Sequence, residues 1–238
     1  MGKDKMRRYC HIVVAGGTGS RFGKSVPKQF ALLCGKPVLM HTIERLRRWG
    51  RGGDVITAMS GEWMDYWREL CSEYGFEAGK TVEGGSTRWH SVKSALDTVG
   101  DDVDVVTVHD GARPLLSKGL MDRVLEALAG GNTAVVPVVC LRESLRMVED
   151  NGGSIGVARS RFRLVQTPQG FDQKSLQWAY SQDYSEEFTD DASVAEAAGM
   201  NVTMVAGDEK NIKITYPADI VVAEYYMERE GDGSTAED

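Results

Sequence analysis

The chain lacks the cysteine and histidine patterns that mark disulfide frameworks and zinc sites. The four cysteines are scattered and form no C-x-x-C pair: they are Cys10, Cys34, Cys71 and Cys140. The four histidines show no ligand spacing either: they are His11, His41, His90 and His109. These absences argue against a disulfide-stapled fold and against a structural zinc site. Any metal is expected to be a hard, oxygen-bound cation that arrives with phosphate groups.

Long apolar runs and an excess of positive charge are also missing. No apolar run approaches the ~20 residues of a membrane-spanning helix. The segment Met1–Arg8 leads directly into an apolar run, without the core of a signal peptide. The 28 Lys and Arg residues are outnumbered by 35 Asp and Glu, which gives a net charge of −7 and argues against a nucleic-acid partner. We therefore expect a cytoplasmic protein with no membrane and no nucleic-acid partner.

Apolar runs alternate with segments of helical periodicity along the 238 residues. The pattern predicts strands at 12–14, 54–59, 103–108, 133–138, 163–166 and 202–205. It predicts helices at 39–46, 63–70, 92–99, 120–128, 174–182, 190–198 and 217–229. Such alternation indicates an α/β fold with a Rossmann-like, mainly parallel sheet and helices on both faces. Ligands of these sheets bind beyond the carboxyl ends of the strands.

Residues 140–158 interrupt this alternation. Charged and apolar residues alternate over Leu141–Glu149, Asp150–Gly153 has turn composition, and Ile155–Ala158 provides a returning strand. The pattern predicts a β-hairpin arm that projects from the sheet. An isolated two-stranded ribbon is marginal in water, so the arm needs a surface to pack on. We expect one domain over residues 1–229, followed by a disordered acidic tail at 230–238.

The glycine-rich segment Ala15–Gln29 carries the clearest chemical signal. It follows an apolar run and contains four glycines and three basic residues. Glycines allow positive φ and close backbone approach, so several N–H groups can converge on one anion. A Walker A loop would need glycine at Thr18, and the dinucleotide fingerprint would need glycine at Phe22. The segment therefore predicts a polyphosphate site that belongs to neither of those two classes.

The pattern A-G-G-T-G-S-R-F-G followed by P-K-Q-F resembles the signature loop of sugar-nucleotide-type nucleotidyltransferases. Four more blocks follow in order: V-H-D-G-A-R-P at 108–114, Q-T-P-Q-G-F at 166–171, F-T-D-D-A-S at 188–193 and N-I-K-I-T at 211–215. Together the five blocks resemble the 2-C-methyl-D-erythritol 4-phosphate cytidylyltransferase family of the non-mevalonate isoprenoid pathway. Ribitol 5-phosphate cytidylyltransferases share most blocks and are the alternative, and a non-catalytic CTP-binding sensor is a second one.

The resemblance implies that an acceptor phosphate oxygen attacks the α-phosphorus of CTP and that pyrophosphate leaves. The nucleophile is already an anion, so the main obstacle is repulsion between anions, which cations and Mg²⁺ reduce. By resemblance, Arg21 and Lys28 face the phosphates and Lys213 reaches the α-phosphate. The residues assigned to CTP are Ala15, Gly16, Gly17, Gly19, Gly85, Arg88 and Ser91. Within this set, the Gly85 backbone and the Ser91 hydroxyl would recognise cytosine, and Arg88 would order the loop.

A second set of residues is assigned to the acceptor. Asp110 ends a predicted strand, where a carboxylate can hold Mg²⁺ directly or through water, although a turn or N-cap aspartate is the alternative. A guanidinium such as that of Arg113 suits bidentate phosphate contact. The acceptor-binding set implied by the resemblance is Asp110, Arg113, Ser144, Arg159 and Thr167. Asp190 and Asp191 are expected to cap a helix rather than to act in catalysis.

Two positions depart from the family pattern. Ser144 stands where threonine is usual, which keeps the hydroxyl and loses a methyl contact. Gly111 stands where alanine is commoner, and we expect it to loosen the loop. The alternation around Lys213 indicates a strand. The resemblance further implies a homodimer whose arms are exchanged, so that Ser144 and Arg159 complete the partner's acceptor site.

Overall fold

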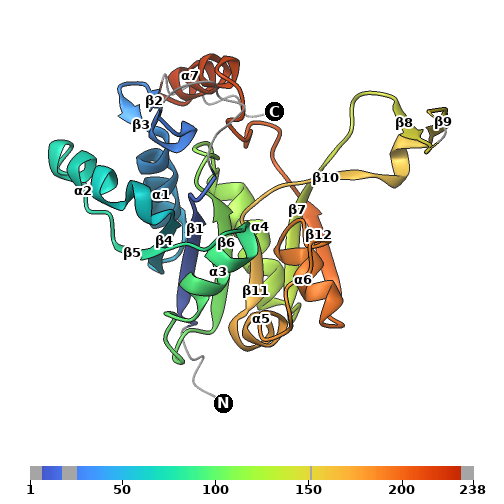
Figure 1. The fold of residues 1–238 in the computed structure, drawn as a ribbon, viewed down its shortest axis with the longest axis horizontal. Coiled ribbons are helices and arrows are strands. Elements are labelled where there is room, and N and C mark those ends of the chain that lie inside the picture. The colour runs from blue at the N-terminus through green and yellow to red at the C-terminus, as the bar shows by residue number, and fades with distance from the viewer. Residues whose placement is uncertain (1–6, 18–25, 151, 232–238) are drawn as a thin grey trace.

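The computed structural model describes residues 7–17, 26–150 and 152–231. In this part of the chain a central sheet carries helices on both faces, and a two-stranded arm projects away from it (Figure 1). The sheet strands are β1 (Tyr9–Val14), β4 (Asp54–Met59), β5 (Lys80–Glu83), β6 (Val105–Asp110), β7 (Ala134–Cys140), β10 (Arg163–Val165), β11 (Gln169–Asp172) and β12 (Val202–Ala206). The α-helices are α1 (Val38–Trp49), α2 (Met64–Glu73), α3 (Arg88–Leu96), α4 (Lys118–Ala129), α5 (Gln173–Ala179), α6 (Asp191–Ala197) and α7 (Ala218–Gly231).

The sheet is mixed, with a parallel half. Its order is β10-β7-β11-β6-β1-β4-β5, and β12 also pairs with β7. Strands β6, β1, β4 and β5 run parallel to one another, whereas β11 runs antiparallel between β6 and β7. The predicted α/β fold with helices on both faces is confirmed. The sequence analysis did not identify β11, because its four residues Q-G-F-D show neither alternation nor an apolar run.

The two faces of the sheet are covered by different sets of helices. On one face α1, α2 and α4 pack on side chains such as Val13 of β1. On the other face α3, α5 and α6 pack on side chains such as Ile12 of the same strand. Because side chains alternate across a strand, the buried strands β1, β4, β6 and β7 each contribute to both cores.

A third apolar cluster joins α7 to the end of the sheet. Ala223 of α7 packs near Ile214, Ala112 and Leu33, the last of which lies in the small hairpin of β2 (Leu32–Leu33) and β3 (Lys36–Pro37). Helix α7 continues to Gly231. Residues 230 and 231 are therefore helical, contrary to the predicted start of the tail, and 232–238 lie outside the described residues. No strand forms at 211–215, so the expected strand around Lys213 is wrong.

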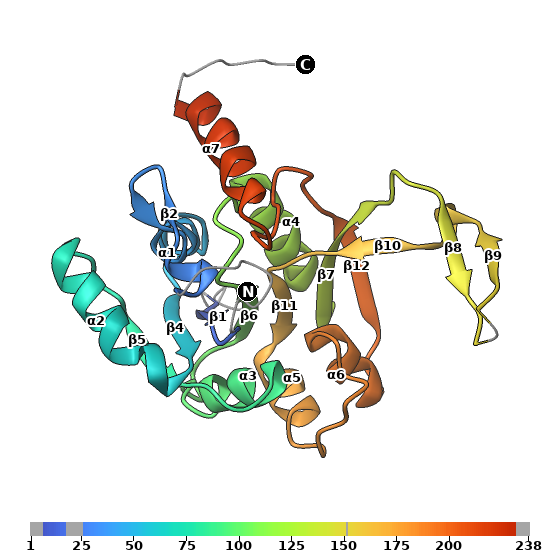
Figure 2. The same cartoon turned by 45° about the horizontal axis from the view of Figure 1, so that its top comes forward.

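The predicted hairpin arm is present. Strands β8 (Leu145–Val148) and β9 (Ser154–Val157) pair antiparallel, and in both views they stand apart from the sheet (Figure 2). Large apolar side chains are exposed on the arm and on the chain that leads back to β7, among them Met147, Val148, Phe162 and Leu164. Within the described residues, no helix has the length and apolar character needed to cross a membrane.

Gly170 of β11 permits close packing of α4 on the sheet. A Cβ at Gly170 would lie 2.6 Å from Val124 Cγ1 and 2.8 Å from Leu128 Cδ1, both buried on α4. We predict that Gly170→Ala lowers the free energy of unfolding by about 1–3 kcal/mol through overpacking. The same change at exposed Gly119 of α4 is the control, because alanine favours the helix by up to about 1 kcal/mol. Urea unfolding of both variants tests this, and equal effects would contradict the packing argument.

Candidate active site

Two adjoining cavities lie beyond the carboxyl ends of the parallel strands. The first has a volume of about 350 Å³ and is bounded by residues 14–17 after β1, by Lys28 and Gln29, and by 85–88 at the start of α3. The second has a volume of about 270 Å³ and is bounded by 165–167, Arg113 and 189–190. Three residues line both cavities: Arg88, Asp110 and Lys213. The cavities therefore share a wall that contains one carboxylate and two cations.

Asp110 is the centre of this shared wall. It is the last residue of β6 and is buried. Lys213 Nζ lies 3.0 Å from Asp110 Oδ2, and Arg113 Nε donates to the same oxygen at 3.1 Å. Arg88 Nε lies 3.9 Å from Oδ1. Burial alone would raise the pKa of Asp110, but Lys213, Arg88 and Arg113 together hold it well below its usual range. Asp110 is therefore ionised at neutral pH.

A buried hydrogen-bond chain fixes the backbone at Asp110. The Asp110 N–H donates to Thr167 Oγ1 at 3.1 Å, and Thr167 Oγ1 lies 2.8 Å from His109 Nδ1. His109 Nε2 lies 3.1 Å from the Arg113 carbonyl oxygen, which can only accept. Nε2 therefore carries the proton, and the Thr167 hydroxyl donates to Nδ1. Burial lowers the pKa of His109 to about 4, so the ring is neutral at neutral pH.

Lys213 is held between two buried neighbours in an irregular segment. Asn211 donates through Nδ2 to the Thr167 carbonyl at 2.7 Å, and its own backbone carbonyl accepts from Arg113 Nη1 at 2.8 Å. Ile214 packs under α7, and its N–H donates to the Ala112 carbonyl at 2.8 Å. The apolar alternation that suggested a strand comes from Ile212 and Ile214, which both pack in the cluster with α7, while Lys213 between them lines the cavities. The sequence analysis assigned no role to Asn211, because its contacts are long-range.

The part of the glycine loop that the structure describes is tied to the first cavity by Gln29. The buried side chain of Gln29 donates through Nε2 to the Ala15 carbonyl at 2.7 Å and to the Gly17 carbonyl at 3.4 Å. Ala15, Gly16, Gly17 and Lys28 line the first cavity, and their contact with CTP stays a prediction. Gly19 and Arg21 lie outside the described residues. Gln29 was not identified as a site residue, although its P-K-Q-F block was.

The segment before α3 forms the opposite side of the first cavity. Ser91 Oγ donates to the Thr87 carbonyl at 3.0 Å and accepts from the Gly85 N–H at 3.2 Å. A Cβ at Gly85 would lie 2.3 Å from His90 Cβ, so this close approach requires glycine. The Ser91 hydroxyl therefore holds the loop at 85–87 against the start of α3. Its predicted contact with cytosine stays a prediction, as does that of the Gly85 backbone.

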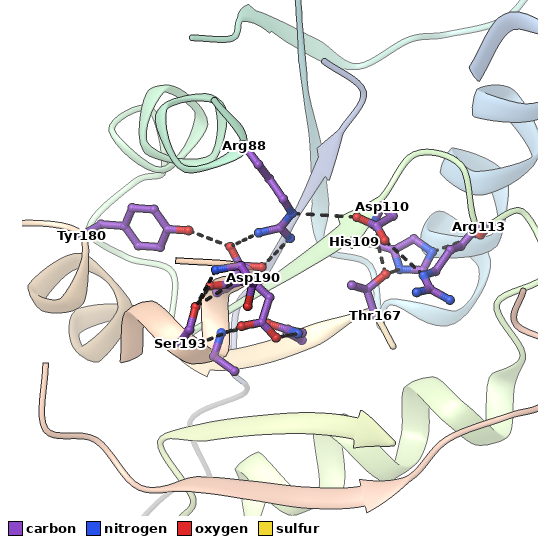
Figure 3. A network of polar contacts seen from close by, with 12 residues as sticks. Arg88, His109, Asp110, Arg113, Thr167, Tyr180, Asp190 and Ser193 are labelled. Atoms are coloured by element: carbon purple, nitrogen blue, oxygen red, sulfur yellow. Dashed lines mark hydrogen bonds and ion pairs between the residues drawn. The ribbon is translucent and has the colours of Figure 1, made fainter. Parts of the chain in front are cut away.

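Arg88 begins α3 and reaches from the first cavity to α6 (Figure 3). Its Nη1 and Nη2 groups donate to Asp191 Oδ1 and Oδ2 at 2.9 and 2.6 Å. Asp190 caps α6 by accepting from Ser193 N at 2.9 Å, as expected for a helix cap. Asp191 instead pairs with Arg88, which corrects its assignment as a capping residue. The pair joins elements far apart in sequence, so local pattern could not reveal it.

Gly111 does not loosen the loop after β6. It is buried, its N–H donates to the Val14 carbonyl at 2.9 Å, and its carbonyl accepts from Thr42 Oγ1 at 3.0 Å. A Cβ at Gly111 would lie 3.0 Å from Leu39 Cδ1 and 3.1 Å from the Val14 carbonyl oxygen. The expectation of a looser backbone is therefore wrong, because both backbone polar groups are bonded and the surroundings are tightly packed.

The predicted acceptor residues divide into two groups. Asp110, Arg113 and Thr167 line the second cavity. Ser144 and Arg159 are exposed on the arm and at its base, and neither lines the two cavities of this chain. The Arg159 guanidinium donates to the Arg142 carbonyl. A single chain therefore does not bring the arm residues to the site.

The described residues offer a modest donor set for a metal ion. No group of three or more His, Cys, Asp or Glu side chains that could hold a metal is found in this part of the chain. Among the described residues that line the first cavity, Asp110 is the one carboxylate. One carboxylate fits Mg²⁺, which commonly takes one or two protein carboxylates together with water and substrate phosphates. The set does not fit zinc.

Comparisons with known proteins identify one protein family over nearly the whole chain. A protein-family model described as "IspD: 2-C-methyl-D-erythritol 4-phosphate cytidylyltransferase" matches residues 9–229. The 2-C-methyl-D-erythritol 4-phosphate cytidylyltransferase of Bacteroides fragilis is 45% identical over 89% of this chain and 96% of its own length. The crystal structure of the enzyme of that name from Thermus thermophilus is 32% identical, with a TM-score of 0.70, over 91% of this chain and 98% of that one.

A second solved structure extends the agreement. The 4-diphosphocytidyl-2C-methyl-D-erythritol synthase of Anaerococcus prevotii is 25% identical, with a TM-score of 0.78, over 94% of this chain and 99% of that one. The family match spans the glycine loop, both cavities and the arm. The chain therefore belongs to the IspD family of 2-C-methyl-D-erythritol 4-phosphate cytidylyltransferases.

Proposed function

We propose that this protein transfers the cytidylyl group of CTP to 2-C-methyl-D-erythritol 4-phosphate, with residues 1–229 acting as one catalytic domain. This proposal is supported mainly by the two cavities, which share Arg88, Asp110 and Lys213 and are assigned below to CTP and to the acceptor. A reaction between two phosphorylated substrates needs two pockets that meet where the new bond forms. A protein that only senses CTP has no use for the second pocket.

The first cavity is the proposed CTP site. The backbone at 15–17 and Lys28 face it, and glycine-rich backbone with a nearby cation suits a triphosphate. Arg21, which follows in the same loop, is proposed to contact the phosphates as well. Gly85 and Ser91 lie on the opposite side and are proposed to receive the base. Gln29 holds the loop by its bonds to backbone carbonyls.

The second cavity is the proposed acceptor site. Arg113 and Thr167 line it, and a guanidinium beside it suits the phosphate of the acceptor. Two Arg113 donors are already used by Asp110 and Asn211, which holds the side chain in place. Asp110 offers its carboxylate toward acceptor hydroxyls from the shared wall. Thr167 contributes through a hydroxyl that also fixes His109 and Asp110.

Lys213 is the proposed electrostatic catalyst. It faces both cavities, and Asp110 fixes its ammonium group at 3.0 Å. Attack of the acceptor phosphate oxygen on the α-phosphorus forms one P–O bond and breaks the bond to pyrophosphate. The acceptor phosphate is an anion already, so no strong base is required. A prepositioned cation beside the α-phosphate offsets the charge that builds there.

We also propose that Mg²⁺ is the metal cofactor and that Asp110 holds it, directly or through water. The ion would neutralise charge on the triphosphate. Asp110 Oδ2 contacts Lys213 and Arg113, whereas Oδ1 lies 3.9 Å from Arg88 Nε, so Oδ1 has the looser contact and would be the oxygen available to such an ion.

The protein is proposed to act as a homodimer with exchanged arms. The arm and the chain at 162–165 expose large apolar side chains, which favours a partner surface. Ser144 and Arg159 do not line the cavities of their own chain. In an exchanged dimer they would complete the partner's acceptor site.

Pyrophosphate release tests the proposed reaction. We predict that CTP yields pyrophosphate only when 2-C-methyl-D-erythritol 4-phosphate is added, and that kcat/KM for this acceptor exceeds that for ribitol 5-phosphate. Small differences between acceptors are worth about 10–200-fold in such a pocket. A preference for ribitol 5-phosphate would change the assigned acceptor. Binding of CTP without release for either acceptor would favour the sensor.

Replacing Lys213 tests the electrostatic role. We predict that Lys213→Ala lowers kcat by about 10²–10³-fold with a small change in KM for CTP, because the contact strengthens in the transition state. Exposed Lys210 in the same segment lines neither cavity, so Lys210→Ala is the matched control and should stay within about twofold of wild type. Steady-state kinetics of the two variants separate local charge loss from general effects. Normal turnover of Lys213→Ala would require another catalytic cation.

Mixed dimers test the shared acceptor site. Lys28→Ala and Arg159→Ala homodimers are expected to be nearly inactive. If Arg159 acts across the dimer, each heterodimer has one doubly altered site and one intact site. Random mixing makes half the dimers heterodimers, so activity should recover to about a quarter of wild type. No recovery after confirmed subunit exchange would show that Arg159 acts within its own chain.

A further inference from the structure

The Arg88–Asp191 ion pair lies at the edge of the wall that the two cavities share. Two parallel hydrogen bonds join the guanidinium to the carboxylate, at 2.9 and 2.6 Å, and Asp191 is fully buried. Burial would lower the pKa of Arg88, but Asp191 more than offsets this and keeps it charged. A bidentate pair fixes the plane of the guanidinium as well as its position.

Asp191 is itself held by an aromatic side chain. The Tyr180 hydroxyl donates to Asp191 Oδ1 at 2.6 Å. Burial raises the pKa of Tyr180, so the hydroxyl keeps its proton and remains a donor. The Tyr180 ring stacks on Trp89, with centroids 5.4 Å apart, and Trp89 follows Arg88 on α3. The carboxylate that holds Arg88 is therefore supported by a tyrosine that is itself packed against α3.

The start of α6 is also fixed to the sheet. Gln169 of β11 is buried, donates through Nε2 to Asp190 Oδ2 at 2.8 Å, and accepts from the Ala192 N–H at 2.9 Å. Asp190 and Ser193 form a capping box around the same turn. Asp191 lies between these anchored residues, so its backbone has little freedom to follow Arg88 if that side chain moves.

The consequence of this arrangement falls on Asp110. With both Nη groups engaged by Asp191, the Nε edge of Arg88 is turned toward Asp110 Oδ1 at 3.9 Å, and Arg88 lies between Tyr180 and Asp110 (Figure 3). Asp110 in turn bonds Lys213 through Oδ2. Since desolvation offsets much of the attraction within a buried ion pair, stability alone does not account for this placement.

We propose that Asp191 is a positioning residue for cytidylyl transfer: with Tyr180 it locks the Arg88 guanidinium at the boundary of the two cavities, and Arg88 thereby orients Asp110 and Lys213. This inference rests on the proposed function and adds a part of the machinery outside both cavities, because neither Asp191 nor Tyr180 lines them. Nothing in the local sequence separates Asp191 from its neighbour Asp190.

Asp191→Asn is the first test, in the cytidylyl-transfer assay on the full-length protein. Asparagine keeps the shape, loses the charge and can accept only one of the two Arg88 bonds. We predict a fall in kcat of about 10–100-fold, as for a displacement of reacting groups by about an ångström, with KM for CTP changed less than about threefold. Tyr180→Phe, which leaves the ion pair intact, should lower kcat by a few-fold.

A double-mutant cycle separates positioning from a structural role. If Asp191 acts through Arg88, then Arg88→Gln with Asp191→Asn should be no slower than Arg88→Gln alone. Independent roles would instead multiply the two losses. The same cycle with Tyr180→Phe in place of Asp191→Asn gives the answer if Asp191→Asn does not fold. Full additivity in the cycle, or wild-type kcat in a folded Asp191→Asn protein, would overturn the inference.

Val194→Ala is the matched control on the same helix. Val194 is buried in the core between α6 and the sheet and lines neither cavity. The substitution should lower Tm while leaving kcat within about twofold of wild type below the melting transition. Equal losses of kcat in Val194→Ala and Asp191→Asn would assign the effect to α6 as a whole and overturn the inference. If the wild-type protein has no transfer activity, both the proposed function and this inference are wrong. If the wild type is active but the Asp191 and Tyr180 variants behave as wild type, only this inference is wrong.

Discussion

The structure depends on the burial of one negative charge. Asp110 ends the central strand β6 at the point where the two cavities meet, and water is largely removed from it. An unpaired buried carboxylate would be protonated or would destabilise the fold. Lys213, Arg113 and Arg88 supply the compensating charges. The site is therefore organised around one buried carboxylate whose charge is compensated by three neighbouring cations.

That gathering of cations also suits the proposed transfer reaction. Each cation near Asp110 is fixed by a second contact: Arg113 by the Asn211 carbonyl, Arg88 by Asp191, and Lys213 by its buried neighbours in the chain. Cations fixed in advance need no reorganisation when negative charge develops on a substrate. The protein as a whole is acidic, at a net charge of −7, so this gathering of three cations around one carboxylate is a local departure from its overall charge.

The sequence predicted those elements and candidate site residues that are marked by a short, contiguous sequence pattern. Strands β1, β4 and β6, the helices that follow them and the arm could be predicted from apolar periodicity, whereas the short strands β5 and β11 were not identified. Short motifs singled out Lys28, Asp110 and Lys213, which line the cavities, and their catalytic roles stay predictions. Residues that act through distant partners could not be predicted in this way. Asp191, Asn211 and Gln29 have side-chain partners on other elements, and only the folded chain brings those elements together.

Two of the errors of local structure, at Lys213 and at Gly111, come from burial that was interpreted as backbone structure. Alternation around Lys213 arises because Ile212 and Ile214 pack in the cluster with α7 while Lys213 lines the cavities, and a strand is not needed for this. Gly111 is buried among Leu39, Val14 and Ala15. Glycine is therefore needed here because the packing leaves no room for a side chain, and not because the backbone must be flexible. A sequence pattern indicates which residues are buried. It does not determine the backbone conformation, because more than one conformation can bury the same residues.

The irregular segment that carries Lys213 has a further consequence for biosynthesis of the protein. The ribosome releases the glycine loop, β6 and Asp110 long before it releases Lys213, whose position depends on Ile214 packing under α7. Asp110 is therefore synthesised well before Lys213, with which it pairs in the folded protein. The wall shared by the two cavities is therefore completed last, with the docking of the C-terminal helix. A chain that ends before α7 would keep the segments 15–17 and 85–88 of the first cavity yet lack the packing that holds Lys213.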